Sequence, residues 1–236
     1  MRCGLIMMCA LTPMAFGQGV CRDLDASRLK IGAFHYRTLV EGRVAGRSRI
    51  QVRRSPDSGD FVFSNLVTGA FNQSWESVAS PQFMPRTARL VFGEGNAART
   101  AFELTYREGR VSGFAVSTRA QPPVRRTVDE SLAESTVDQR IDWAAVMSFP
   151  VYEPDWECTF RVYDPGTGNS LVHVKIGRTE RVHVPAGTFE GVLVTYRIDK
   201  NRGSEVYRVT MDRRSRFLVK EAFPDGAITE LVEIEP

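Results

Sequence analysis

Hydrophobic and polar side chains alternate along the last third of the chain, residues 169–236. In residues 188–198 the alternation has a period of two, which is typical of a β-strand with one buried face. The same period recurs in the segments that follow, and polar turns such as Asn201-Arg202-Gly203 and Pro224-Asp225-Gly226 separate them. Connections this short join antiparallel neighbours, so the pattern predicts a meander of antiparallel strands.

The first half of the chain shows the same pattern. Strands are predicted at residues 34–40, 44–54, 61–68, 83–92, 101–106 and 111–118. Arg107-Glu108-Gly109-Arg110 is a strong hairpin signal between the last two. Pro85 has no backbone N–H to donate, so its strand should carry a bulge or lie at a sheet edge. The segment around Trp75 is compatible with a crossing or with a short strand.

One segment between the two runs of strands is expected to be helical. Asp129-Glu130-Ser131 begins it, and Ser131 with Glu134 fits a capping box. Residues 136–138 are a possible division within it, and Phe149-Pro150 ends it. About eleven strands and one helix, without alternation of the two, predict an all-β fold. We expect a curved antiparallel meander, as a half-barrel or open barrel, with the helix packed either inside or outside it.

The N-terminus has the pattern of a secretory signal peptide. One positive charge precedes a short apolar run, and small residues at positions 15 and 17 fit cleavage before Gln18. We therefore expect residues 1–17 to be a signal peptide, with a buried N-terminal element as the alternative, and residues 18–236 to form a single domain. The run is too short to cross a bilayer, and no other apolar run is long enough. The protein should be exported, to the periplasm or secreted, from a cell with a Gram-negative-type envelope.

Cysteine usage agrees with export. Cleavage would leave Cys21 and Cys158 as the two cysteines of the mature chain. In an oxidising compartment they could form one disulfide, or they could remain two thiols. Val20 stands where a lipoprotein signal has a small residue before its cysteine, which favours a protein without a lipid anchor.

Charge and motifs exclude several classes of function. The chain has 31 basic and 28 acidic residues, a net charge of +3, which is too balanced to indicate a nucleic-acid partner. Basic clusters such as Arg213-Arg214 fit either a wet sheet face or contact with anionic headgroups. Neither a Gly-x-Ser-x-Gly elbow nor a phosphate-binding glycine loop is present in the sequence.

The sequence also gives little support for a metal site or for acid–base catalysis. His173 and His183 would face each other if residues 177–179 formed a hairpin, but a third metal ligand is not evident. Asp138 and Asp142, four residues apart on the predicted helix, fit a solvated face better than a catalytic pair. We therefore expect no enzyme activity, no metal and no cofactor.

Three blocks carry a resemblance to a known family. They are YDPGTGNSLVHV at residues 163–174, VPAGTFEGVLVTYR at 184–197 and KEAFPDGAITELV at 220–232. In these blocks the chain resembles exported bacterial proteins with domain of unknown function 3108, most strongly over residues 127–235 and more weakly over 34–52. The family offers no established reaction or catalytic residues. Its architecture resembles the curled sheets of periplasmic lipoprotein carriers, which implies a half-barrel able to hold acyl chains.

These observations lead to a hypothesis of ligand binding. We expect a non-enzymatic envelope protein that binds a lipid or another amphipathic envelope molecule within its curved sheet. The alternative is a structural or assembly factor that contacts other proteins through an exposed sheet edge. The candidate lining residues, which could equally be plain core residues, are Phe34, Tyr36, Trp143, Val192, Val194, Tyr196, Tyr207, Val209 and Phe217.

Overall fold

The computed structural model describes residues 19–69, 72–117, 122–150, 152–201 and 203–235. In this part of the chain, sixteen strands form one sheet. The strands of the N-terminal half are β1 (Gly19–Val20), β2 (Gly32–Val40), β3 (Arg43–Arg54), β4 (Phe61–Gly69), β5 (Gln73–Ala79), β6 (Pro85–Phe92), β7 (Arg99–Arg107), β8 (Arg110–Ser117) and β9 (Val124–Ser131). Those of the C-terminal half are β10 (Thr136–Asp138), β11 (Glu157–Asp164), β12 (Gly168–Val184), β13 (Gly187–Lys200), β14 (Gly203–Asp212), β15 (Leu218–Ala222) and β16 (Ile228–Ile234).

The sheet is a long meander in which most neighbours in sequence are also neighbours in space. Its order runs from β1 and β11 through β16 to β2 and on to β9, while β10 pairs with β11 alone. The last strand β16 lies antiparallel to β2, so the C-terminal run of strands continues into the N-terminal run. The path ends at β1 and β9 without closing. The predicted curved and open all-β sheet is therefore confirmed.

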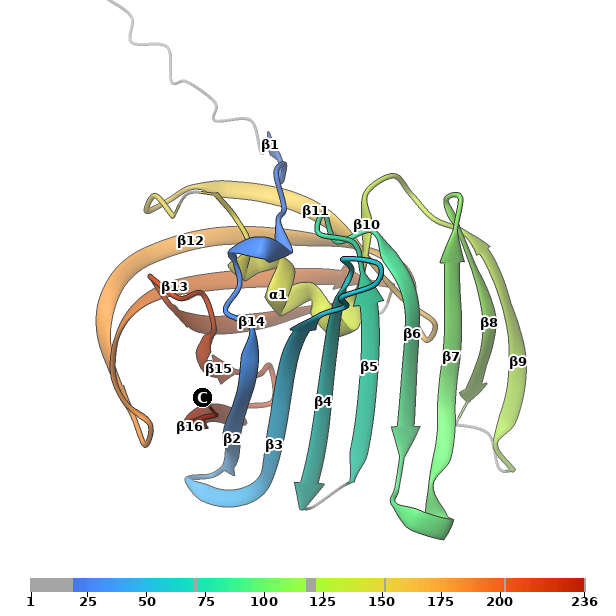
Figure 1. Cartoon of the computed structure of the whole chain (residues 1–236), viewed down its shortest axis with the longest axis horizontal. Helices are drawn as coiled ribbons and strands as arrows, with labels where there is room; N and C mark the ends of the chain where they lie inside the picture. The colour runs from blue at the N-terminus through green and yellow to red at the C-terminus, as the bar shows by residue number, and fades with distance from the viewer. Residues whose placement is uncertain (1–18, 70–71, 118–121, 151, 202, 236) are drawn as a thin grey trace, which may run out of the picture.

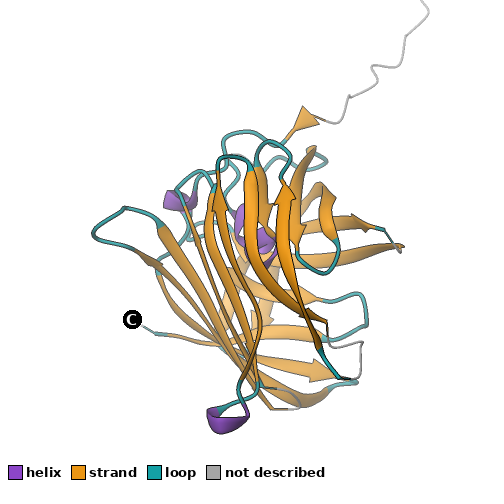
Figure 2. Ribbon diagram, turned by 90° about the vertical axis from the view of Figure 1, so that its right-hand side faces the viewer, coloured by secondary structure: helices purple, strands orange, loops and turns teal. Residues whose placement is uncertain are grey.

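The sheet curls so that its two runs of strands face each other. Strands β2 to β9 form one layer and the long strands β11 to β14 cross behind it, with a short helix between them (Figure 1). Figure 2 shows the two layers from the side. Most of the buried apolar side chains, including Phe34, Phe63, Val194 and Met211, form one cluster between the layers. A second cluster lies under β6 to β9.

The helix lies inside the curled sheet. It is α1 (Asp142–Met147), and all six of its residues are buried. The 3₁₀ turn η3 (Gln139–Ile141) leads into it, and two further 3₁₀ turns are η1 (Ala26–Arg28) and η2 (Gly95–Ala97). The side of the sheet on which the helix packs, which the pattern leaves open, is thus the concave one. In the described residues, no helix has the length and hydrophobicity needed to cross a bilayer.

The prediction of a helix from residue 129 is wrong. Residues 124–131 form β9, which pairs along its whole length with β8. Ser135, at a φ of 57°, and the short β10 then separate β9 from η3. The physical reason is that β8 would otherwise leave a row of backbone groups without partners, and a full ladder outweighs one local capping box.

The prediction of about eleven strands is too low. Strands β9 and β10 replace the expected start of the helix, and β5 is a full strand around Trp75. Strand β1 has only two residues and exists through its parallel pairing with β11. Such short strands carry no period of their own, because a neighbour brought near by the fold creates them.

The N-terminal segment is bonded covalently to the sheet. Cys21 and Cys158 form a disulfide, with a Cα–Cα distance of 5.0 Å. The Cys21 N–H also donates to the Thr159 carbonyl at 2.8 Å, next to the pairing of β1 with β11. Of the two states left open by the sequence, the structure contains the bridge. The expected signal peptide, residues 1–17, lies outside the described residues.

Candidate ligand-binding cavity

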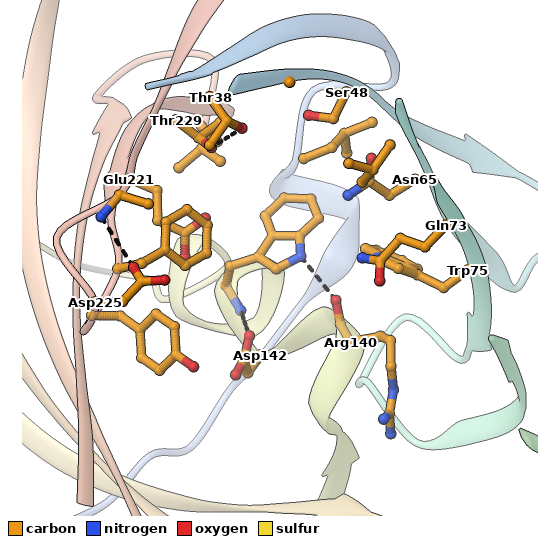
Figure 3. Close-up of a pocket in the computed structure, with 18 of the residues that line it drawn as sticks. Thr38, Ser48, Asn65, Gln73, Trp75, Arg140, Asp142, Glu221, Asp225 and Thr229 are labelled. Atoms are coloured by element: carbon orange, nitrogen blue, oxygen red, sulfur yellow. Dashed lines mark hydrogen bonds between the residues drawn. The ribbon is translucent and has the colours of Figure 1, made fainter. Parts of the chain in front are cut away.

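A cavity of about 550 Å³ lies on the concave side of the sheet, above η3 and α1. Side chains of β2 to β6 form one wall, and side chains of β13 to β16 with their connecting turns form the other. Figure 3 shows Asn65, Gln73 and Trp75 on one side and Glu221 on the opposite side, with Asp142 near the base. The curl of the sheet creates this space, because strands far apart in sequence come to face each other across α1.

Aromatic rings make up much of the cavity surface. Trp143 on α1 lines the cavity, and its indole N–H donates to the Arg140 carbonyl at 2.9 Å, which holds the ring in place. Tyr196 and Tyr207 lie opposite each other on β13 and β14, and their rings stack with centroids 5.0 Å apart. Trp75 lines the other wall. Such rings provide a large apolar surface for a bound chain or ring.

Polar side chains share the walls with these rings. Thr38 and Thr229 hydrogen-bond to each other through their hydroxyls at 2.9 Å across the β2–β16 junction. Two buried oxygens, Asn65 Oδ1 and Gln139 Oε1, have no hydrogen-bond partner within the described part of the chain. Buried acceptors without donors are costly, and both belong to residues that line the cavity. The lining therefore combines apolar surface with acceptors that lack donors.

Two carboxyl groups line the cavity deep in the protein. Asp142 is 6% exposed and Glu221 is 8% exposed. Burial raises the pKa of Asp142 to about 7, although the Trp143 N–H and the charge of Arg140 oppose the change. Burial also raises the pKa of Glu221 to about 8, and the nearby charge of Asp142 adds to this, while a hydrogen bond from Tyr196 opposes it. Around neutral pH both carboxyl groups are therefore partly protonated.

The raised pKa of Glu221 predicts a pH-dependent stability. Below about pH 4 this carboxyl is protonated in both the folded and the unfolded chain and costs nothing. As pH rises toward 8 the unfolded chain releases the proton and the folded chain keeps it, so the folded state loses stability, on the order of 4 kcal/mol. We expect Glu221→Gln to stabilise the protein by this amount at pH 8 and by little at pH 4, measured by urea denaturation. An equal gain at both pH values would attribute the effect to packing.

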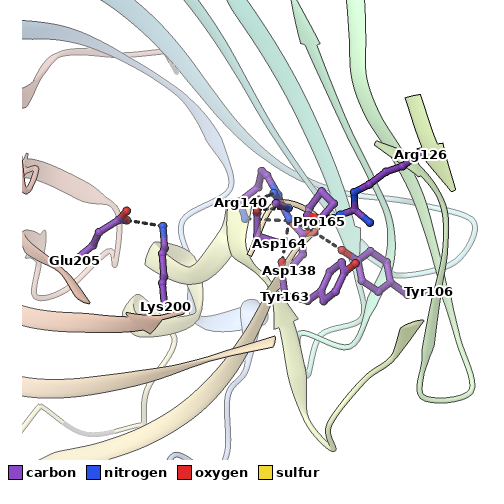
Figure 4. A network of polar contacts seen from close by, with 10 residues as sticks. Tyr106, Arg126, Asp138, Arg140, Tyr163, Asp164, Pro165, Lys200 and Glu205 are labelled. Atoms are coloured by element: carbon purple, nitrogen blue, oxygen red, sulfur yellow. Dashed lines mark hydrogen bonds and ion pairs between the residues drawn. The ribbon is translucent and has the colours of Figure 1, made fainter. Parts of the chain in front are cut away.

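Arg140 connects the base of the cavity to the outer strands. Its guanidinium donates to both oxygens of Asp138, at 2.7 and 2.8 Å, and to Asp164 Oδ2 at 2.6 Å. Tyr106 donates its hydroxyl to Asp138 from β7 (Figure 4). Burial alone would lower the pKa of Arg140, but the carboxylates of Asp138 and Asp164 raise it, so the side chain stays charged. The Arg140 guanidinium is therefore already paired with two carboxylates, those of Asp138 and Asp164.

The structure separates the nine predicted lining residues into two groups. Trp143, Tyr196 and Tyr207 line the cavity. The other six lie in the core and do not line it, so the plain core interpretation holds for them: Phe34, Tyr36, Val192, Val194, Val209 and Phe217.

Sequence reasoning missed the buried acids in and below the cavity. The spacing of Asp138 and Asp142 predicts a solvated helix face, but Asp138 is fully buried and Asp142 nearly so. The strand pattern contained a signal for Glu221, since Val219 and Glu221 share one face of β15 by their period of two. An acid on the apolar face of a strand indicates a buried functional or structural role.

The histidines lie elsewhere. His173 and His183 belong to one continuous strand, β12. Between Ile176 and Thr179 this strand has a bulge and not a hairpin, so the two histidines do not face each other on paired strands. His173 pairs with Asp199 at 2.8 Å, and His183 contacts Thr188. Neither they nor His35 lines the cavity. The described residues contain no group of three side chains placed to ligate a metal.

Comparisons with known proteins give a family and distant structural likenesses. No curated protein matches the chain. A protein from Bacteroides fragilis, described as exported and of YmcC-like fold, is 12% identical with a TM-score of 0.39, over 88% of this chain and 97% of that one. A protein from Parabacteroides distasonis, described as a lipoprotein, is 11% identical with a TM-score of 0.35, over 88% and 96%. The family described as Protein of unknown function (DUF3108) matches residues 33–232.

Proposed function

We propose that this chain, which belongs to the DUF3108 family of proteins of unknown function, is a non-catalytic binding protein that holds an amphipathic small molecule in the concave cavity. The observation that carries the proposal is the cavity itself. Its volume of about 550 Å³ lies in the range of small-molecule sites, roughly 300–1,000 Å³. Cores are close-packed, so a space of this size beside a buried helix is uncommon and supports a binding role.

The lining supports a ligand with two different ends. Trp75, Leu90 and Val67 offer apolar surface along β4 to β6. The carboxyl groups of Asp142 and Glu221 lie at the base and on the opposite wall (Figure 3). An amphipathic molecule would place its apolar part against the first surface and its polar part near the second. A purely apolar ligand would leave the buried polar atoms without partners.

The same proposal places the protein outside the cytoplasm, with a lipid or another amphipathic molecule of the cell envelope as its ligand. The disulfide between Cys21 and Cys158 supports this, because such bonds persist in oxidising compartments.

Native mass spectrometry tests the proposal. The full chain is expressed in a Gram-negative host, recovered from the periplasm and measured before and after denaturation. We expect an additional mass of lipid size that is released on unfolding. Ser48 lines the cavity from β3, and Ser48→Phe should fill it and reduce the bound fraction at least about tenfold, since a ring in the cavity removes the space for the ligand.

A matched control makes the same change outside the cavity. Ser64 lies on the neighbouring strand β4 in a surface groove rather than in the cavity, so Ser64→Phe should retain the bound mass. Loss of the mass in both variants would point to general disruption. A bare protein accompanied by a specific co-purifying protein would overturn the proposal and favour an assembly factor acting through protein contacts.

A further inference from the structure

We infer that the polar end of the ligand is a cationic ammonium group, which binds between the carboxyl groups of Asp142 and Glu221. The inference rests on the proposed function and adds the chemical class of the ligand. It starts from the two most buried acids of the cavity, each more than nine-tenths buried. Carboxyl groups this deep are normally paired with a cation or hydrogen-bonded on both oxygens.

The protein itself supplies no cation to this pair in its described part. Neither Asp142 nor Glu221 takes part in any of its ion pairs. Arg140, the nearest guanidinium in the cavity wall, is held by Asp138 and Asp164. Lys200 is held by Glu205 at 2.5 Å. Arg140 and Lys200, the two basic groups whose charges act on Asp142, are therefore both paired with other acids.

The hydrogen bonds of the two carboxyls are equally incomplete. Within the described residues Glu221 accepts one bond, from the Tyr196 hydroxyl at 3.3 Å, which is near the limit for such a contact. Asp142 accepts from the N–H of its own neighbour, Trp143, at 2.6 Å. A carboxylate has about four acceptor sites, so each group retains capacity for donors from a ligand.

The rest of the lining fits an ammonium group. Such a group carries three N–H donors and no acceptor. The buried oxygens Asn65 Oδ1 and Gln139 Oε1 are further acceptors without donors in the cavity lining. Trp143 and Tyr196 add aromatic rings, which attract cations when water is excluded. A ligand with a carboxylate or phosphate would instead add negative charge beside two carboxyl groups whose ionisation is already opposed by burial.

Proton linkage gives the inference a second readout. The raised pKa values of Asp142 and Glu221, about 7 and about 8, mean that the pair is partly protonated at pH 7. The other ionisable groups that act on them are Arg140 and Asp138 beside α1, Lys200 and Tyr196 on β13, Tyr207 on β14 and Tyr36 on β2. The tyrosines stay neutral because burial raises their pKa. Binding of a cation should then expel about one proton and tighten as pH rises from 6 to 8.

Three probes with the same apolar chain isolate the charge of the polar end. Dodecylamine is a cation at pH 8, 1-dodecanol is neutral and dodecanoate is an anion. Binding to the delipidated full chain is measured by calorimetry below the micellar or solubility limit of each probe, in two buffers that differ in ionisation enthalpy. We expect dodecylamine to bind at least about tenfold more tightly than dodecanol, as for one charge-assisted hydrogen bond, and dodecanoate to bind more weakly than either.

Glu221→Gln tests the site. It removes one of the two carboxyl groups with little change in shape, so the preference for the amine over the alcohol should fall severalfold, with Asp142 as the remaining acid, and the release of protons should fall. Glu76→Gln is the control, since Glu76 pairs with Arg53 at the surface and does not line the cavity. Equal binding of amine and alcohol to the unmodified protein, or an amine preference that is unchanged in Glu221→Gln, would overturn the inference and leave the proposed function intact. Binding of none of the three probes would overturn the proposed function as well.

Discussion

Replacement of Arg140 by alanine is expected to destabilise the protein by about 3–5 kcal/mol, measured by urea denaturation. Arg140 is 9% exposed and pairs with Asp138, whose side chain is completely buried. Without the guanidinium, the Asp138 charge would remain in the interior with only the Tyr106 hydroxyl and a backbone N–H as donors. The substitution also removes the contact of Arg140 with the Phe102 ring, 4.6 Å from its centroid. The base of the cavity should therefore be the part of the fold most sensitive to the loss of one charge.

Two further variants check this explanation. Arg110 pairs with Asp129 at 2.6 Å, but both side chains are more than half exposed, so Arg110→Ala should cost less than about 1 kcal/mol. The double variant Arg140→Met with Asp138→Asn removes the fully buried charge of Asp138 together with its partner and should recover part of the lost stability. Asp164 also loses its partner, but its side chain is 25% exposed and keeps access to water. A loss below about 1 kcal/mol for Arg140→Ala would show that water reaches Asp138 and that the network contributes little.

Removal of the disulfide, by Cys21→Ser together with Cys158→Ser, is expected to lower the free energy of unfolding by roughly 4 kcal/mol. The bridge joins residues 137 apart, so it restricts the unfolded chain strongly. It also holds η1 over the core, where Ala26 and Leu29 are buried. Arg28 donates to the Ser148 carbonyl at 2.8 Å, directly after α1, so the N-terminal segment helps to hold the helix inside the sheet.

Denaturation with and without a reductant measures this effect in the unmodified protein, and the serine variant should match the reduced form. Hydrogen exchange should show increased opening at β1 and η1 before the central strands open. A midpoint that does not change on reduction would mean that β1 and η1 are held by their packing alone.

Local turn chemistry was readable from the sequence because it depends on the sterics of a few adjacent residues. Glu108 and Gly109 both have positive φ, 50° and 71°, as a tight hairpin turn requires, and β7 and β8 pair on either side of them. Pro85 lies opposite a shift in register at Ala79, which is the predicted bulge. In each case the residue limits its own backbone conformation or hydrogen bonding, and this limit does not depend on the rest of the fold.

The burial of Asp138, Asp142 and Glu221 could not be read from the sequence in the same way. Asp138 and Asp142 carry the spacing of a solvated helix face, and only the strands that close over them make them buried. Glu221 pairs with Val209 across the β14–β15 ladder. Burial and then the charge of Glu221 raise the pKa of Tyr36, a residue from near the start of the chain. A pKa depends on everything within several ångströms, and most of those neighbours are remote in sequence.

The amino-acid sequence is enough to predict the strands with clear alternation, their tight turns, the all-β class and the pair of cysteines available for a bridge. The folded sheet is needed to show that residues 124–131 become β9, that α1 lies inside the curl and that Asp142 and Glu221 line one cavity. The physical reason is the range of the forces involved. Period and turn chemistry act between adjacent residues, whereas ladder completion, burial and charge pairing depend on partners that the folded sheet brings together, as β16 and β2 are.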